Sequence, residues 1–232
     1  MNQISRRDVL KNGAAASFLA LLSVAGLSGA AFAARPDGKV ISPAKALDLI
    51  KRGNARWAAK KPVRANYAPK GQTLEAGQWP IAAILGCADS RVQPDELFDV
   101  VPANLFVVRN AGNVVDDDVL GSLEYAVEHL GVGVIVALGH QSCGAVKAAD
   151  AAVLTGAMPG GHIDAIVNKI SPAIKTLSAA HTIDEAVHVN AVQSAKELIA
   201  LSPILEEAEK AGKLIVVSGE YSLHTKKVTF SE

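Results

Sequence analysis

The segment IAAILGCADSR at residues 81–91 joins an uninterrupted apolar run to a group of polar and ionisable side chains. A second segment, VIVALGHQSCG at residues 134–144, is built in the same way. Short apolar runs of this kind predict strands that are buried on both faces of a parallel sheet. Ligand sites in such sheets form beyond the carboxyl ends of the strands, so the two polar groups should lie side by side.

Further apolar runs, separated by helical patterns, predict an α/β fold. Apolar runs at residues 81–85, 105–108, 132–138 and 214–217 predict four strands, and residues 221–230 predict a closing hairpin strand at the sheet edge. Helical periodicity is found at residues 94–98, 118–130, 143–154, 162–177, 183–201 and 203–211. Strands that alternate with helices predict a mainly parallel sheet of four strands plus the C-terminal edge strand, flanked by helices.

One more helix precedes the first strand. Ser42 and Pro43 suit the N-cap and the first helical position, and helical periodicity continues to about Lys60. Its apolar residues lie on roughly one side, at Ala46, Leu47, Ile50 and Trp57. Residues 42–60 are therefore predicted to form an N-terminal helical arm whose apolar stripe needs a surface to cover it.

Residues 1–33 have the features of a secretory signal. The twin arginines Arg6 and Arg7 precede an Ala/Gly/Ser-rich apolar stretch at residues 14–33, which ends in the small-x-small pattern Ala31-Phe32-Ala33. We therefore predict a twin-arginine signal peptide at 1–33, export to the periplasm, and a single domain at 34–232. The alternative is a permanent membrane anchor, which the weakly apolar composition of the stretch disfavours.

Composition excludes several classes of function. The chain has 232 residues, half of them hydrophobic, which is enough for the core of one domain. Its 23 basic and 23 acidic residues provide no basic excess for nucleic acid, and no polybasic tail that would hold it at a membrane once the signal is cleaved. The two cysteines are too few for a disulfide scaffold.

Cys87, His140 and Cys143 have the chemistry of a catalytic zinc site. Zinc binds thiolate sulfur and imidazole nitrogen in tetrahedral geometry, and three protein ligands leave the fourth position for water. The His-x-x-Cys spacing at a strand-to-helix turn lets both side chains reach one ion, and a helix N-terminus at Cys143 favours its thiolate. Each residue alone is more often structural, but together they predict one Zn²⁺ per subunit.

Asp89 follows Cys87 by two residues and is followed by Arg91 after two more. Two roles are open for this carboxylate: a fourth zinc ligand in a closed state, or the acceptor of a hydrogen bond from zinc-bound water. A bidentate contact from Arg91 would keep the carboxylate ionised and off the metal. We therefore predict a catalytic pair in which Asp89 orients the nucleophile and Arg91 holds Asp89.

With Cys87-x-Asp89-x-Arg91 and His140-x-x-Cys143, the chain resembles the β-class carbonic anhydrases from about residue 42 to the C-terminus. The resemblance implies zinc-dependent, reversible hydration of carbon dioxide to bicarbonate and a proton, in which zinc-bound hydroxide attacks the substrate in an apolar pocket. Carbonic anhydrase is itself the standard example of zinc lowering the pKa of bound water to about 7. Two thiolate ligands should raise that pKa, so activity is expected to increase with pH on an ionisation above 7.

Four more residues match positions of the plant-type members of this family. The resemblance implies that substrate is bound by Gln78, Phe106, Tyr125 and Gly144, the last through the backbone amide that holds the aspartate. Active sites of the family lie at a dimer interface. This implies a homodimer or higher homo-oligomer and makes the 42–60 helix a dimer arm.

Other functions stay open at this point. A carbon disulfide or carbonyl sulfide hydrolase would use the same zinc scaffold, and access to the pocket would decide between these activities. A nonenzymatic zinc-binding protein would exchange its metal readily and show no hydration activity. An NAD-linked dehydrogenase is disfavoured because no Gly-x-Gly-x-x-Gly follows a strand. A Cys-x₅-Arg phosphatase is excluded because Ala149 occupies the arginine position.

Overall fold

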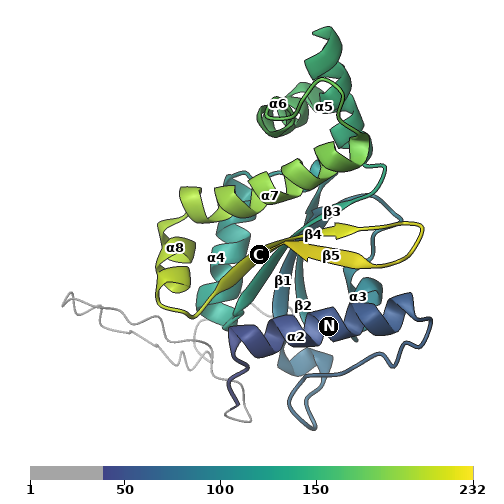
Figure 1. The fold of residues 1–232 in the computed structure, drawn as a ribbon. Coiled ribbons are helices and arrows are strands. Elements are labelled where there is room, and N and C mark those ends of the chain that lie inside the picture. Colours follow the sequence, from purple (N-terminus) through teal and green to yellow (C-terminus); the bar gives the residue numbers. More distant parts are fainter. Residues whose placement is uncertain (1–38, 232) are drawn as a thin grey trace, which may run out of the picture.

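The computed structural model describes residues 39–231, which form a five-stranded sheet with helices on both faces (Figure 1). The strand order is β2-β1-β3-β4-β5; the first four strands run parallel, and β5 is antiparallel to β4. The predicted fold class is therefore confirmed. The signal peptide predicted at 1–33 lies outside the described residues. The strands are β1 (Ala82–Cys87), β2 (Leu105–Asn110), β3 (Val134–His140), β4 (Ile215–Tyr221) and β5 (Val228–Ser231).

Two layers of helices cover the sheet, and a helical pair lies outside them (Figure 1). One face packs against α2 (Pro43–Ala58) and the short α3 (Pro94–Leu97), and the other against α4 (Asp117–Leu130), α7 (Ile183–Leu201) and α8 (Pro203–Lys210). The pair α5 (Gly144–Thr155) and α6 (Ile163–Ile174) packs together beyond one end of α7. None of the helices in residues 39–231 has the length and hydrophobicity needed to span a bilayer.

Burial on both faces explains the continuous apolar runs of the central strands. In β1, Ile84 packs on the α2 side with Val136 of β3, whereas Leu85 packs on the α4 side with Ile135. Every residue of β1 and β3 is buried. A polar side chain in the middle of either strand would therefore have to be desolvated, so polar groups are confined to the strand ends.

The prediction of a closing hairpin strand at residues 221–230 is wrong in its bounds. Tyr221 is the last residue of β4, where it pairs with His140 of β3, and β5 begins only at Val228. The segment between them turns back through hydrogen bonds from the Ser222 amide to the Lys227 carbonyl and from the Lys226 amide to the Ser222 carbonyl. Lys226 has a φ of 61°, a left-handed conformation that the sequence did not signal because no glycine marks it.

The N-terminal helix occupies 43–58, close to its predicted bounds, but its apolar stripe is covered within the same chain. Leu47 and Ile50 are buried in the core cluster that includes Ile84 of β1 and Val136 of β3. The dimer arm that the resemblance implies for residues 42–60 therefore does not follow from this stripe and stays a prediction. The sheet itself provides the apolar surface.

A fully buried carboxylate fastens α2 to the rest of the domain. Asp99 follows α3 and accepts hydrogen bonds from Arg56 Nε of α2 at 2.5 Å and from the amides of Val63 and Arg64 at 3.0 and 2.7 Å. Burial raises the pKa of Asp99, but the bonds from Arg56 and the two amides outweigh it, so the net pKa is lowered. The ionised form therefore stabilises the fold.

Replacing Asp99 by asparagine should lower the free energy of unfolding by about 3 kcal/mol, because donors aimed at a buried carboxylate lose their acceptor. A carboxyl group with a depressed pKa contributes above its unfolded-state pKa and loses that contribution as pH falls. The difference in the free energy of unfolding between wild type and Asp99→Asn should therefore become smaller in acid. Urea unfolding at pH 7 and at about pH 2.5, below the ordinary carboxyl pKa of about 3.9, measures it.

Asp48→Asn provides the matched control. Asp48 is an exposed carboxylate of α2 that pairs with Lys45 and Arg52, and exposed pairs are worth under about 1 kcal/mol. Equal losses of stability for the two variants would contradict the anchoring role of Asp99.

Candidate metal centre

The three predicted ligands meet at the carboxyl edge of the sheet. Cys87 is the last residue of β1, His140 is the last residue of β3, and Cys143 is the N-cap of α5. Parallel pairing aligns Gly86 of β1 with Leu138 of β3, so both strands end at the same level. The ligands are buried, and one donor atom from each lies within 4.8 Å of the others.

The spacing and chemistry of these donors fit zinc. The sulfur atoms of Cys87 and Cys143 are 3.9 Å apart, and two zinc–sulfur bonds of about 2.3 Å at a tetrahedral angle would place them about 3.8 Å apart. His140 Nδ1 lies 3.0 Å from the carbonyl oxygen of Gln141. A hydrogen bond from Nδ1–H to this oxygen leaves Nε2 unprotonated, with its lone pair available to a metal. Nε2 is buried and has no hydrogen-bond partner within residues 39–231, as expected of a nitrogen that faces a cation.

The pKa values of the two thiols shift in opposite directions. The contact with the Cys143 thiol lowers the pKa of Cys87, against the effect of burial and with help from the Gly112 amide, which lies 3.4 Å from Cys87 Sγ. The pKa of Cys143 is raised, because a second thiolate beside the first would be unfavourable and because the group is buried. A cation between the sulfurs removes this conflict and favours both thiolates.

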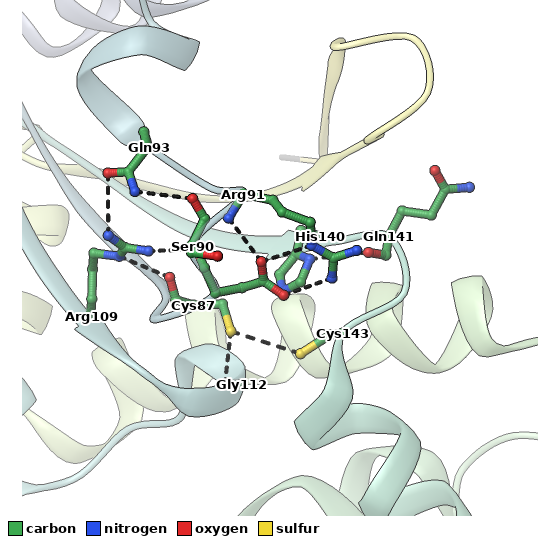
Figure 2. Close-up of polar contacts among 10 residues, drawn as sticks. Cys87, Ser90, Arg91, Gln93, Arg109, Gly112, His140, Gln141 and Cys143 are labelled. Carbon is green, nitrogen blue, oxygen red and sulfur yellow. Dashed lines mark hydrogen bonds and ion pairs between the residues drawn. The ribbon is translucent and has the colours of Figure 1, made fainter.

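Asp89 and Arg91 form the bidentate pair that the sequence predicts (Figure 2). Arg91 Nε donates to Asp89 Oδ1 at 2.9 Å and Nη2 to Oδ2 at 2.7 Å, and the Arg91 amide adds a bond to Oδ1 at 2.9 Å. These bonds hold the pKa of Asp89 well below its usual range. Oδ2 lies 3.9 Å from His140 Nε2, so the ionised carboxylate borders the space enclosed by the metal ligands.

Comparison with known proteins agrees with this geometry. Residues 82–228 match the family model described as carbonic anhydrase. Carbonic anhydrase 2 of Mycobacterium tuberculosis is 40% identical over 185 residues, which cover 78% of this chain and 89% of that protein. The chain belongs to the β-carbonic anhydrase family.

Solved structures of β-carbonic anhydrases have the same fold. The Coccomyxa enzyme, solved in complex with acetazolamide, is 28% identical with a TM-score of 0.59, and the match covers 80% of this chain and 81% of that one. A β-carbonic anhydrase of Aspergillus fumigatus is 26% identical with a TM-score of 0.60, over 68% of this chain and 78% of that one.

Three residues predicted for the substrate pocket of this β-carbonic anhydrase lie away from the metal ligands of their own subunit. Phe106 pairs with Ala83 of β1, four residues before Cys87, which at about 3.3 Å per residue is a separation of about 13 Å. Tyr125 of α4 packs against Phe106 with ring centroids 6.3 Å apart and is 48% exposed. Gln78 precedes β1 and is exposed. These side chains therefore gather toward the amino end of the sheet, opposite the ligands.

Gly144, the fourth predicted pocket residue, is the exposed first residue of α5, directly after the ligand Cys143. Its amide is not bonded to Asp89 within the described residues. Arg91 provides the hydrogen bonds of that carboxylate instead. Gly144 thus lies beside the metal centre without the contact that the resemblance implied.

Arg109, the penultimate residue of β2, is not among the residues that the sequence predicts for the site. Its Nε donates to the carbonyl oxygen of Cys87 at 2.9 Å and its Nη2 to that of Asp89 at 2.7 Å (Figure 2). One guanidinium therefore fixes the backbone of both a predicted metal ligand and the predicted catalytic carboxylate. The available signal was a charged residue directly after the apolar run 105–108, on a strand predicted to lie in the same sheet.

Replacing Arg109 by lysine should lower kcat/KM for carbon dioxide hydration by about 10-fold or more, a typical effect of changing the groups that orient metal ligands. A single ammonium group lacks the planar fork that spans two carbonyl oxygens. Stopped-flow assays measure the effect, with the exposed Arg52→Lys on α2 as the control. Unchanged kcat/KM in Arg109→Lys would show that the loop keeps its geometry without the guanidinium.

Proposed function

We propose that this chain catalyses the reversible hydration of carbon dioxide to bicarbonate and a proton, with one zinc ion held by Cys87, His140 and Cys143. The convergence of two thiols and one imidazole within 4.8 Å, beside an ionised carboxylate, carries this proposal. Three protein ligands leave a coordination position for water. Bound zinc supplies the Lewis acidity that makes water a nucleophile near neutral pH.

The carboxylate of Asp89 accepts the hydrogen bond that orients the nucleophile in this proposal. Arg91 donates to both carboxylate oxygens, which keeps Asp89 ionised and leaves the metal position open beside it. Arg91 is itself half exposed, so solvent reaches the outer side of the pair. Because these bonds lower the pKa of Asp89 strongly, the carboxylate is a weak base whose role is to orient the nucleophile.

We propose further that the working enzyme is a homodimer or a higher homo-oligomer. Gln78, Phe106 and Tyr125 are at the wrong end of the sheet to serve the metal centre of their own subunit, yet two of them expose their side chains. A two-fold interface places the same patch of each subunit against the other subunit's site. Each pocket would then combine the metal ligands of one chain with the three pocket residues of the other chain.

Export to the periplasm is also a proposal. It is supported by Arg6 and Arg7, the apolar stretch at 14–33 and the cleavage pattern that ends at Ala33. An oxidising compartment would make disulfide formation between two free cysteines a hazard, and bound zinc would protect both sulfurs.

Purified protein should contain one zinc per chain and hydrate carbon dioxide, whereas Cys143→Ala should lose both the metal and the activity. Metal analysis and stopped-flow measurement on the same samples test this, with carbon disulfide and carbonyl sulfide assayed in parallel. Zinc-loaded protein that cleaves those two substrates but leaves carbon dioxide unreacted would favour the hydrolase. Readily exchanged zinc with no turnover of any substrate would favour a zinc-binding protein.

Subunit mixing tests the shared pocket. Gln78→Ala and Cys143→Ala chains should each be nearly inactive, because one lacks a pocket residue and the other lacks a metal ligand. Refolding them together should restore about a quarter of wild-type activity, since half of randomly paired dimers contain one complete site out of two. Mixing Cys143→Ala with Cys87→Ala chains provides the control, because no pairing of these two restores a ligand set. Equal activities for both mixtures would contradict a pocket built from two chains.

A further inference from the structure

A buried turn places a backbone amide on the sulfur of a metal ligand. Residues Ala111–Asn113 follow β2 as a short turn, and the amide of Gly112 donates to Cys87 Sγ at 3.4 Å (Figure 2). Gly112 has a φ of 78°, and a Cβ at this position would lie 2.8 Å from Ile170 Cδ1 and 3.0 Å from Ala145 Cβ. Glycine is therefore required both by the backbone conformation and by the close approach of α5 and α6.

Two polar residues of α7 fasten this turn from the other side. Asn190 Nδ2 donates to the carbonyl oxygen of Gly112 at 2.9 Å, and Ser194 Oγ donates to that of Asn113 at 2.9 Å. Asn190 is 3% exposed and Ser194 is 2% exposed. The side chain of Asn113 returns a bond to Ser194 Oγ at 3.3 Å, so the turn and the helix are connected in both directions.

These two side chains interrupt an otherwise apolar surface. The buried side of α7 also contains Val187, Ala191 and Leu198, which pack against the sheet and against α5 and α6. Burying an amide and a hydroxyl there is unfavourable unless both are hydrogen-bonded. Their bonds to the turn satisfy them, and the turn bears the amide that reaches the ligand sulfur.

A hydrogen bond from an amide to a thiolate draws charge from the sulfur and weakens its donation to a bound metal. Groups behind the ligands commonly set ligand orientation and electron donation in this way. The strength of such a bond depends on the position of the amide, and hydrogen bonds to charged acceptors are roughly twice as strong as neutral ones.

We propose that Asn190 is a positioning residue of the metal centre: it holds the Gly112 turn so that the amide stays on Cys87 Sγ, with Ser194 as the second anchor. This inference rests on the zinc site proposed above and extends it to the buried face of α7. Asn190 acts through the turn and does not touch the metal or the substrate. Its loss should therefore alter the sulfur ligand even where zinc still binds.

Cobalt(II) substitution reports on the sulfur directly, because the sulfur-to-cobalt charge-transfer band depends on the electron density of the thiolates. In Asn190→Ala the band should shift to longer wavelength, since a sulfur without its hydrogen bond donates more readily. The zinc Kd, measured by competition with a chromophoric chelator, should rise by about 10-fold, because the loss of ligand orientation outweighs the stronger donation from the sulfur. Ser194→Ala should shift the band in the same direction by a smaller amount, and alanine in a helix at this position keeps the helix intact.

Asn54→Ala is the matched control. Asn54 is a buried asparagine of α2, 4% exposed, whose Nδ2 donates to the carbonyl oxygens of Leu97 and Lys226, neither of which is a ligand or part of the Gly112 turn. This variant should lose thermal stability to a similar degree and keep the wild-type band. A purely structural role for Asn190 predicts that both asparagine variants behave alike.

The outcomes separate this inference from the function on which it rests. If cobalt-treated wild-type protein shows no sulfur-to-cobalt band, both the proposed metal site and this inference are wrong. A wild-type band that stays in place in both Asn190→Ala and Ser194→Ala would overturn the inference alone, whatever the change in zinc affinity. If Asn190→Ala does not fold, the band of Ser194→Ala decides between the two results.

Discussion

The parallel pairing of β1 with β3 is the constraint on which the metal centre depends. Because Gly86 is level with Leu138, Cys87 and His140 end their strands side by side. A shift of this pairing by one residue would move one strand end about 3.3 Å along the other and separate the two ligands. The turn after β3 then brings Cys143 to the start of α5, where the helix dipole favours a thiolate. Ligands from two segments that are far apart in the sequence thus meet around one centre.

Backbone atoms around the ligands are held by side chains from several elements. Arg109 of β2 fixes the carbonyls of Cys87 and Asp89, and Asn190 of α7 fixes the turn whose amide reaches the Cys87 sulfur. On the solvent side Arg91 forms a charge-assisted pair with Asp89. On the buried side Asn190 forms a neutral hydrogen bond with the Gly112 carbonyl. Such preorganisation limits the rearrangement needed when the site binds its metal and substrate.

The length of the sheet separates the ligands of one chain from the residues expected to line the pocket. Phe106 and Tyr125 pack together toward the amino end of the strands, whereas the metal centre occupies the carboxyl end. Side chains cannot bridge that distance within one subunit, which is why we propose a pocket shared between two chains. The apolar stripe of α2 does not add to this argument, since Leu47 and Ile50 are covered by the chain's own sheet.

The α/β order, the ligand set and the Asp89–Arg91 pair could be predicted from the sequence, because apolar runs and ligand spacing are local and the residue types leave few chemical alternatives. Local pattern also explains the mistakes: nothing in residues 221–230 shows that Tyr221 pairs with His140 or that Lys226 adopts a left-handed turn. Arg109 and Asn190 acquire their roles only in the folded chain. Their partners are backbone carbonyls, and a carbonyl group is present at every residue, so only tertiary packing decides which one a side chain reaches.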